Sequence, residues 1–170
     1  MQVSFKVPQP EAFDLRRWLL EECTAFYQST SEHELSDEQV QRLYFICDIE
    51  GALLGTPRDV VRTLNAIKLS WSAVRDKIDY SDLVWLQLVK LSNEALYVWI
   101  EQYLLEYAAI SEGAAIEETR RTDATGELEK HLRDRGAVDA RSIWRFQRFV
   151  PGVRPGADGR FSLFNEESQD

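Results

Sequence analysis

The chain has too few basic residues to balance its acidic ones. It contains 20 lysines and arginines against 29 aspartates and glutamates, which leaves a formal net charge of -9. Sequence-independent binding to nucleic acid needs a basic surface that releases counterions, and anionic membranes attract basic segments in the same way. The charge therefore disfavours nucleic acids and anionic membranes as partners of this chain.

Cysteine is also scarce, and long apolar runs are missing. The only two cysteines, Cys23 and Cys47, lie in apolar stretches with helical spacing, which predicts buried, reduced thiols and not a disulfide scaffold. Met1 is not followed by the basic and apolar segments of a signal peptide. The most apolar region, 83–105, is interrupted by charged and amide side chains, so we expect no transmembrane segment. These absences predict a cytoplasmic protein.

The sequence contains none of the common catalytic or metal-binding signatures. None of the five lysines is followed by serine or threonine, so the Walker A loop that holds nucleotide phosphates is absent. His33 and His131 are far apart, and neither has a histidine or cysteine at ligand spacing. No Gly-x-Ser-x-Gly motif marks a nucleophile. We therefore expect no catalytic residue and no metal site in this chain alone.

The apolar residues recur at helical spacing, which predicts an all-α fold, an irregular helical bundle. We expect an extended arm at 1–10, a helical bundle at 11–110, a charged helical part at 111–164, and a disordered polar tail at 165–170. The bundle contains five predicted helices, at 11–28, 36–49, 57–74, from Asp79 to about 92, and 94–109. In the charged part we expect one or two short helices broken near 122–126, and another helix at 140–149. Phe161, Leu163 and Phe164 are expected to pack back onto the fold.

Two of these helices begin with clear capping signals. Ser36 is followed three residues later by Gln39, the pattern of a capping box. Thr56 precedes Pro57, which suits the first position of a helix. The segment LYFICDIEG, residues 43–51, resembles the apolar strand and acidic end of a Walker B motif, but its helical spacing after the Ser36 cap indicates a buried helix.

The third helix carries arginines that helix rules do not explain. Arg58 lies in its first turn, where a positive charge opposes the helix dipole by a few tenths to about 1 kcal/mol. Arg58, Arg62 and Asn65 are spaced by four and three residues and share one face. On composition alone this is a solvated face on which Asp59 pairs with Arg62. The alternative is an anion site, because guanidinium groups bind phosphate in a bidentate way.

Three segments resemble the region that follows the nucleotide-binding core in KAP family P-loop NTPases. LLGTPRDVVRTLNAI, residues 53–67, is similar to the family's Thr-Pro-Arg-x-apolar-x-Arg-x-apolar-Asn signature. QVSFKVPQP, residues 2–10, resembles the segment that leaves the last core strand, and IDYSDLVWLQLVKLSNEALYVWI, residues 78–100, resembles the helix pair that comes next. The order and spacing of the three agree and cover 2–106, whereas the chain from 108 onward matches nothing in the family. The Walker A and Walker B segments are missing.

The resemblance implies a C-terminal, AAA-like helical lid whose P-loop core lies outside this chain. Arg58 would correspond to the sensor-2-type arginine that reaches the γ-phosphate of ATP, with Arg62 as a supporting or alternative contact. Asn65, on the same face, is the third expected nucleotide-binding residue. ATP and magnesium would be bound by the full-length protein and not by this chain, which would be inactive alone. The lid would report the nucleotide state to a protein partner or to a second copy. Some members of the family are linked to membranes or to phage exclusion.

Two other functions stay open at this point. The chain could be a stand-alone helical protein–protein interaction module, with Trp85, Tyr97, Trp99 and Trp144 as partly exposed anchors. Aromatic residues with this spacing more often belong to the core. It could also bind nucleic acid through the stripe formed by Arg141, Arg145 and Arg148, although the acidic balance of the chain argues against this.

Overall fold

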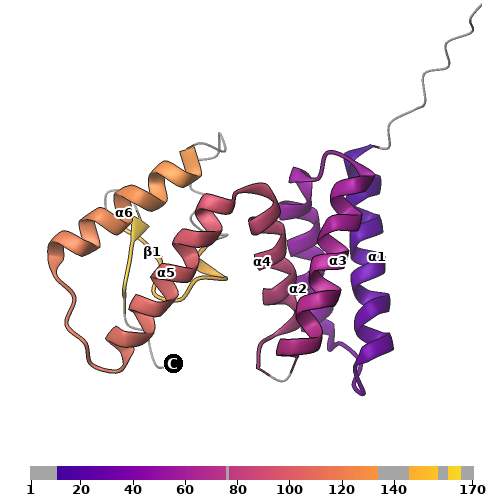
Figure 1. Cartoon of the computed structure of the whole chain (residues 1–170), viewed down its shortest axis with the longest axis horizontal. Helices are drawn as coiled ribbons and strands as arrows, with labels where there is room; N and C mark the ends of the chain where they lie inside the picture. The colour runs from indigo at the N-terminus through magenta and orange to yellow at the C-terminus, as the bar shows by residue number, and fades with distance from the viewer. Residues whose placement is uncertain (1–10, 76, 134–145, 157–160, 166–170) are drawn as a thin grey trace, which may run out of the picture. The chain divides into compact units, whose positions relative to one another are not determined.

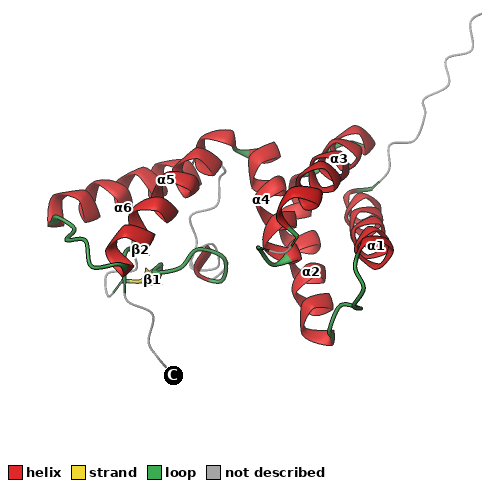
Figure 2. Ribbon diagram, turned by 60° about the horizontal axis from the view of Figure 1, so that its bottom comes forward, coloured by secondary structure: helices red, strands yellow, loops and turns green. Residues whose placement is uncertain are grey.

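A computed structural model describes residues 11–75, 77–133, 146–156 and 161–165 (Figure 1). Most of the described backbone is helical (Figure 2), which confirms the all-α fold class. The expected extended arm at 1–10 and the last five residues of the chain lie outside the described residues. The chain divides into two compact units between Ser92 and Asn93.

The N-terminal unit is a bundle of four helices. Its elements are α1 (Ala12–Thr30), α2 (Asp37–Ile49), the short 3-10 helix η1 (Glu50–Leu53), α3 (Pro57–Val74) and α4 (Tyr80–Ser92). Both α1 and α4 pack beside α2 and α3, so α1 and α4 occupy opposite corners of the bundle (Figure 1). The predicted starts of α2 and α3 are confirmed, because both capping boxes form.

Each helix of this bundle buries the apolar stripe that its spacing predicts. Leu15, Leu19 and Cys23 of α1 recur every four residues and are buried. Cys23 and Cys47 are both buried free thiols, as predicted. A hydrogen bond with the Cys23 thiol, together with burial, raises the pKa of Cys47, so this thiol stays protonated. The segment 43–49 lies in α2, so it is a helix and not a Walker B strand.

The C-terminal unit is built on two helices and a short hairpin. Its elements are α5 (Glu94–Ser111), α6 (Glu118–Arg133), β1 (Arg154–Pro155) and β2 (Phe161–Ser162), and the two strands pair antiparallel. The sequence analysis assigned residues 93–110 to the N-terminal bundle, whereas the structure groups them with the residues that follow. The reason is packing within this unit: Asn93 donates to the carbonyl of His131, and Arg120 forms a double hydrogen bond with Glu106.

The expected break near 122–126 is wrong, because α6 runs without interruption. Ala124, Leu128 and Leu132 recur every four residues and are all buried, so one continuous helix covers the core. Gly126 lies on the exposed side of this helix, where a missing side chain leaves no cavity. The predicted helix at 140–149 lies mostly outside the described residues.

The last described residues form hydrogen bonds with Tyr103 of α5. Phe161, Leu163 and Phe164 are buried, as predicted. Tyr103 of α5 donates its hydroxyl hydrogen to the carbonyl of Pro151 and accepts from the amide of Phe164. Asn165, which the sequence analysis placed in the polar tail, bonds to the carbonyl of Gly152 through both its main-chain and side-chain nitrogens.

Candidate functional site

The first turn of α3 is held by a closed capping box. The Asp59 amide donates to the Thr56 hydroxyl at 3.3 Å, and the Asp59 carboxylate accepts from the Thr56 amide at 3.0 Å and from its hydroxyl at 2.8 Å. Pro57 occupies the first helical turn, where its missing N–H costs nothing. The carboxylate of Asp59 is therefore turned toward the cap.

Arg58, Arg62 and Asn65 lie together on the solvent side of α3, as their spacing predicts, and all three are exposed. None of the three side chains forms a hydrogen bond or an ion pair with another residue of the described ranges. In particular, the expected pair between Asp59 and Arg62 does not form there, because the capping box holds the carboxylate. The two guanidinium groups are one helical turn apart and repel each other weakly.

Packing on the other side of α3 decides which residues face outward. Val60, Leu64, Ile67 and Trp71 are buried between α1 and α4. The opposite face presents Arg58, Arg62 and Asn65 together with two exposed apolar side chains, Val61 and Leu69, of which Leu69 is 78% exposed. We call these five residues the arginine face of α3. A surface of this composition suits an anionic or protein partner, because its charges are not neutralised within the described bundle.

The chemistry available at the arginine face is anion binding. Two guanidinium groups offer planar, bidentate donors, and the main-chain amides of the first helical turn add partial positive charge. Among the described residues, no group of three or more histidine, cysteine, aspartate or glutamate side chains could hold a metal ion. A magnesium ion that accompanies a nucleotide phosphate would therefore need ligands from elsewhere.

The anchors expected for an interaction module are largely enclosed. Trp85 and Trp99 are 3% and 4% exposed, so both are core residues, as is usual for such aromatic side chains, and not the partly exposed anchors of the alternative. Both rings fill the cores of their own units, and the Trp99 indole donates to Glu127 at 3.2 Å. Tyr97 is half-buried and donates to Glu101. Trp144 lies outside the described residues.

Most of the arginine stripe considered for nucleic-acid binding lies outside the described residues. Arg141 and Arg145 lie outside the described residues, and Arg148 alone of the three is described. Within the described ranges, no helix is both long enough and apolar enough to cross a membrane.

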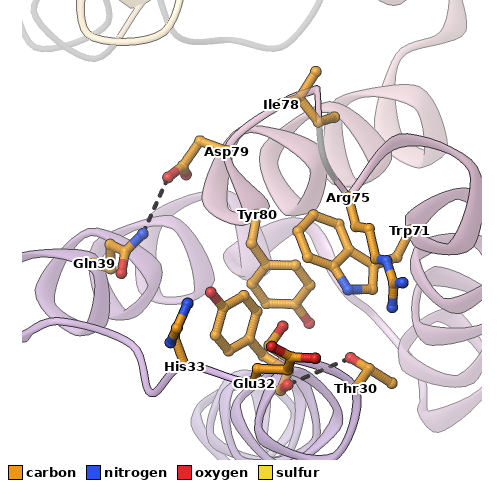
Figure 3. A pocket seen from close by; sticks show the side chains of 11 residues that line it. Thr30, Glu32, His33, Gln39, Trp71, Arg75, Ile78, Asp79 and Tyr80 are labelled. Atoms are coloured by element: carbon orange, nitrogen blue, oxygen red, sulfur yellow. Dashed lines mark hydrogen bonds between the residues drawn. The ribbon is translucent and has the colours of Figure 1, made fainter.

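A second feature of α3, at its other end, was missed by the sequence analysis. Trp71 and Arg75 line a pocket there together with Tyr27 and Tyr80 (Figure 3). Trp71 also belongs to the buried stripe of α3. No local pattern predicts the pocket, because its residues come from four helices and two connecting loops spread over more than fifty positions.

Comparison with known proteins relates the chain to one curated protein. It is 32% identical over 171 residues to the phage T7 exclusion protein of Escherichia coli strain K12. The match covers 100% of this chain but 23% of that protein, so the chain spans about a quarter of the length of its relative. No family model matches the chain, and no solved structure matches it.

Proposed function

We propose that this chain is the helical lid of an ATP-hydrolysing protein of the KAP type that acts in the cytoplasm. In this proposal Arg58 contacts the γ-phosphate of an ATP molecule held by a P-loop core that lies outside the chain. Arg62 and Asn65 support that contact. The lid carries no catalytic machinery of its own and passes the nucleotide state on to a protein partner.

The unpaired arginines of α3 carry this proposal. Arg58 opposes the helix dipole, Arg62 adds a second positive charge one turn later, and neither is neutralised within the described residues. The capping box holds the one carboxylate of the first turn, Asp59, so the arrangement keeps both guanidinium groups available. An anion bound from another domain explains this arrangement. Its negative charge would offset the repulsion between the two guanidinium groups and the unfavourable interaction of Arg58 with the helix dipole.

The relative bears only on the antiviral part of the proposal. The family that the sequence resembles includes members linked to phage exclusion, and the relative is named as a phage T7 exclusion protein. About three quarters of that relative lies outside the match, which leaves ample room for a nucleotide-binding core in a protein of that length. We infer by analogy that the protein containing this chain acts against phage.

The decisive experiment measures ATP turnover of the native protein that contains this chain, with and without Arg58→Ala. An arginine that stabilises charge on a transferring phosphoryl group contributes about 10³-fold or more to the rate. We therefore expect a fall of at least about 100-fold for Arg58→Ala and a smaller fall for Arg62→Ala. The matched control is Arg17→Ala, which removes an exposed arginine of α1 that pairs only within its own helix. Unchanged turnover in Arg58→Ala would remove this residue from the mechanism.

A second experiment asks whether the same residue matters for phage. Cells that express the native protein are challenged with phage T7, and the plating efficiency is compared between the native protein, Arg58→Ala and Arg17→Ala. We expect Arg58→Ala to lose exclusion while Arg17→Ala retains it. Exclusion that survives in Arg58→Ala, at equal protein levels, would separate the antiviral role from nucleotide sensing.

An interaction module without ATP chemistry is the second candidate, and the exposed apolar residues of α3 favour it. Leu69 is 78% exposed and lies on the same face as Arg62 and Asn65. If the arginine face only docks a protein, then Leu69→Ser should weaken that complex and Arg58→Ala should leave ATP turnover unchanged. The two candidates therefore differ in which substitution affects which assay.

A further inference from the structure

The N-terminal unit contains a half-open pocket of about 440 Å³ at the C-terminal end of α3 (Figure 3). Its walls come from the end of α1, the loop that follows it, the start of α2 and the junction between α3 and α4. A volume of this size is typical of sites for small ligands. Because Trp71 is thirteen residues after Arg58 on a helix that rises 1.5 Å per residue, the pocket is about 20 Å from the first turn of α3. It is a separate site.

Three aromatic rings in mutual contact form the floor of the pocket. The centroid of the Tyr80 ring lies 5.0 Å from those of Tyr27 and Trp71, and Tyr27 and Trp71 are 5.9 Å apart. The Tyr80 hydroxyl donates to the carbonyl of Cys23 at 2.8 Å. Burial raises the pKa of Tyr80, so this hydroxyl stays a donor. The three rings pack against one another, and polar side chains line the space above them.

One buried hydrogen-bond donor on this floor has no acceptor among the described residues. Trp71 is 5% exposed, and its indole Nε1–H makes no hydrogen bond with any described residue. In Figure 3 this nitrogen is turned toward the space between Arg75 and Thr30. A buried donor without an acceptor costs about 1–3 kcal/mol. The nitrogen itself is covered, so a ligand oxygen would recover this free energy once the side chains over it shift. Arg75 lines the same pocket, and its guanidinium favours an acceptor with negative charge, such as a carboxylate.

The carboxylates around the pocket differ in what they already bind. Asp79 accepts from the amide of Ser81 at 2.8 Å and from the Gln39 side chain at 3.5 Å. Glu32 makes no hydrogen bond or ion pair with any described residue, and it lines the same pocket as Trp71 and Arg75 (Figure 3). Glu32 can therefore bind a positively charged group of a ligand whose carboxylate is held by Trp71 and Arg75.

We propose that this pocket binds a small zwitterion with an apolar body, either a free α-amino acid or a short peptide. The ligand carboxylate accepts from the Trp71 indole and from Arg75, its ammonium group donates to Glu32, and its apolar body contacts Tyr27 and Ile78 at the pocket wall. This inference does not depend on the ATPase proposal, because it rests on the other end of α3 and involves no nucleotide.

The test follows the indole N–H of Trp71 by nuclear magnetic resonance. The chain has five tryptophans, and Trp71→Phe identifies the resonance of Trp71 by its disappearance. The probes are the free L-amino acids, one at a time at millimolar concentration, and the dipeptides of those that bind. Acetate and methylammonium serve as half-ligand controls. We expect at least one amino acid or dipeptide to shift the Trp71 resonance saturably, and whichever of the two binds more tightly identifies the natural form of the ligand.

Two variants of the same loop then test the assigned contacts. Glu32→Gln is expected to weaken binding of the active probe about tenfold, because it removes a charge-assisted hydrogen bond. Glu34→Gln is the matched control, since Glu34 is exposed on the same loop but does not line the pocket. The proposal is overturned if no amino acid or dipeptide moves the Trp71 resonance, if acetate binds as tightly as the best probe, or if Glu32→Gln and Glu34→Gln bind it equally well.

Discussion

Replacing Gly152 by alanine is expected to destabilise the C-terminal unit by about 2–5 kcal/mol. The residue has a φ of 70°, in the left-handed region that costs a residue with a Cβ about 1–2 kcal/mol. A Cβ at this position would also lie 2.3 Å from Cε2 of Tyr107 and 2.9 Å from the hydroxyl of Tyr103. Moving these rings is expensive, because Tyr103 bonds to both Pro151 and Phe164. Overpacking of this kind costs about 1–3 kcal/mol more.

Alanine substitutions at two other glycines of the same unit separate the cost of backbone strain from the cost of overpacking. Gly113 has a φ of 101°, but a Cβ there would meet nothing within 4 Å, so Gly113→Ala should cost only the backbone strain of about 1–2 kcal/mol. Gly126 lies in α6 with open space around it, so Gly126→Ala should stabilise the protein by about 0.5–1 kcal/mol.

The assay for all three glycine variants is urea unfolding followed by far-UV circular dichroism. The expected order of unfolding midpoints is Gly126→Ala above the native chain, then Gly113→Ala, then Gly152→Ala. The slope of the transition should stay constant, so that midpoints report stability. A Gly152→Ala variant as stable as Gly113→Ala would refute the packing of Tyr107 and Tyr103 against residue 152.

Three further predictions concern single side chains. Burial raises the pKa of Tyr103 to about 12, so the folded state holds this proton more tightly than the unfolded state. The contribution of Tyr103 to the free energy of unfolding should therefore be fully present below pH 10 and fall by about 2–3 kcal/mol between pH 10 and 12. Urea unfolding across this range should show a smaller fall in the free energy of unfolding for Tyr103→Phe. Thr56→Ala should cost about 1 kcal/mol, because it removes the acceptor of the capping box. Arg58→Ala should leave thermal stability unchanged or raise it slightly, since Arg58 opposes the helix dipole, and a clear loss of stability would mean that this side chain has a structural role instead.

Local rules predicted the helices of the N-terminal unit well. The starts of α2 and α3 follow from Ser36 with Gln39 and from Thr56 with Pro57, because a capping box is made by residues three positions apart. The outward position of Arg58 and Arg62 follows from the same periodicity that buries Val60 and its neighbours.

Local rules were less useful where contacts join distant positions. The polar composition around Gly126 suggested a break, but the buried side of α6 holds the helix together. Trp85 and Trp99 could have been surface anchors on spacing alone, and only the packing of each unit shows that they are enclosed. The pocket at the end of α3 likewise requires Tyr27, Trp71 and Tyr80 to meet, which no helical period can predict.

The sequence by itself determined where the helices begin, which stripe each one buries, and that two arginines of α3 share a solvent face. These properties depend on neighbours within one or two turns, so they can be worked out before any tertiary contact is known. Only the tertiary structure decided that the Asp59 carboxylate and both arginines stay apart, and that Trp71 has a buried N–H without an acceptor among the described residues. Whether a polar group finds a partner depends on side chains brought close by folding, and sequence spacing does not contain that information.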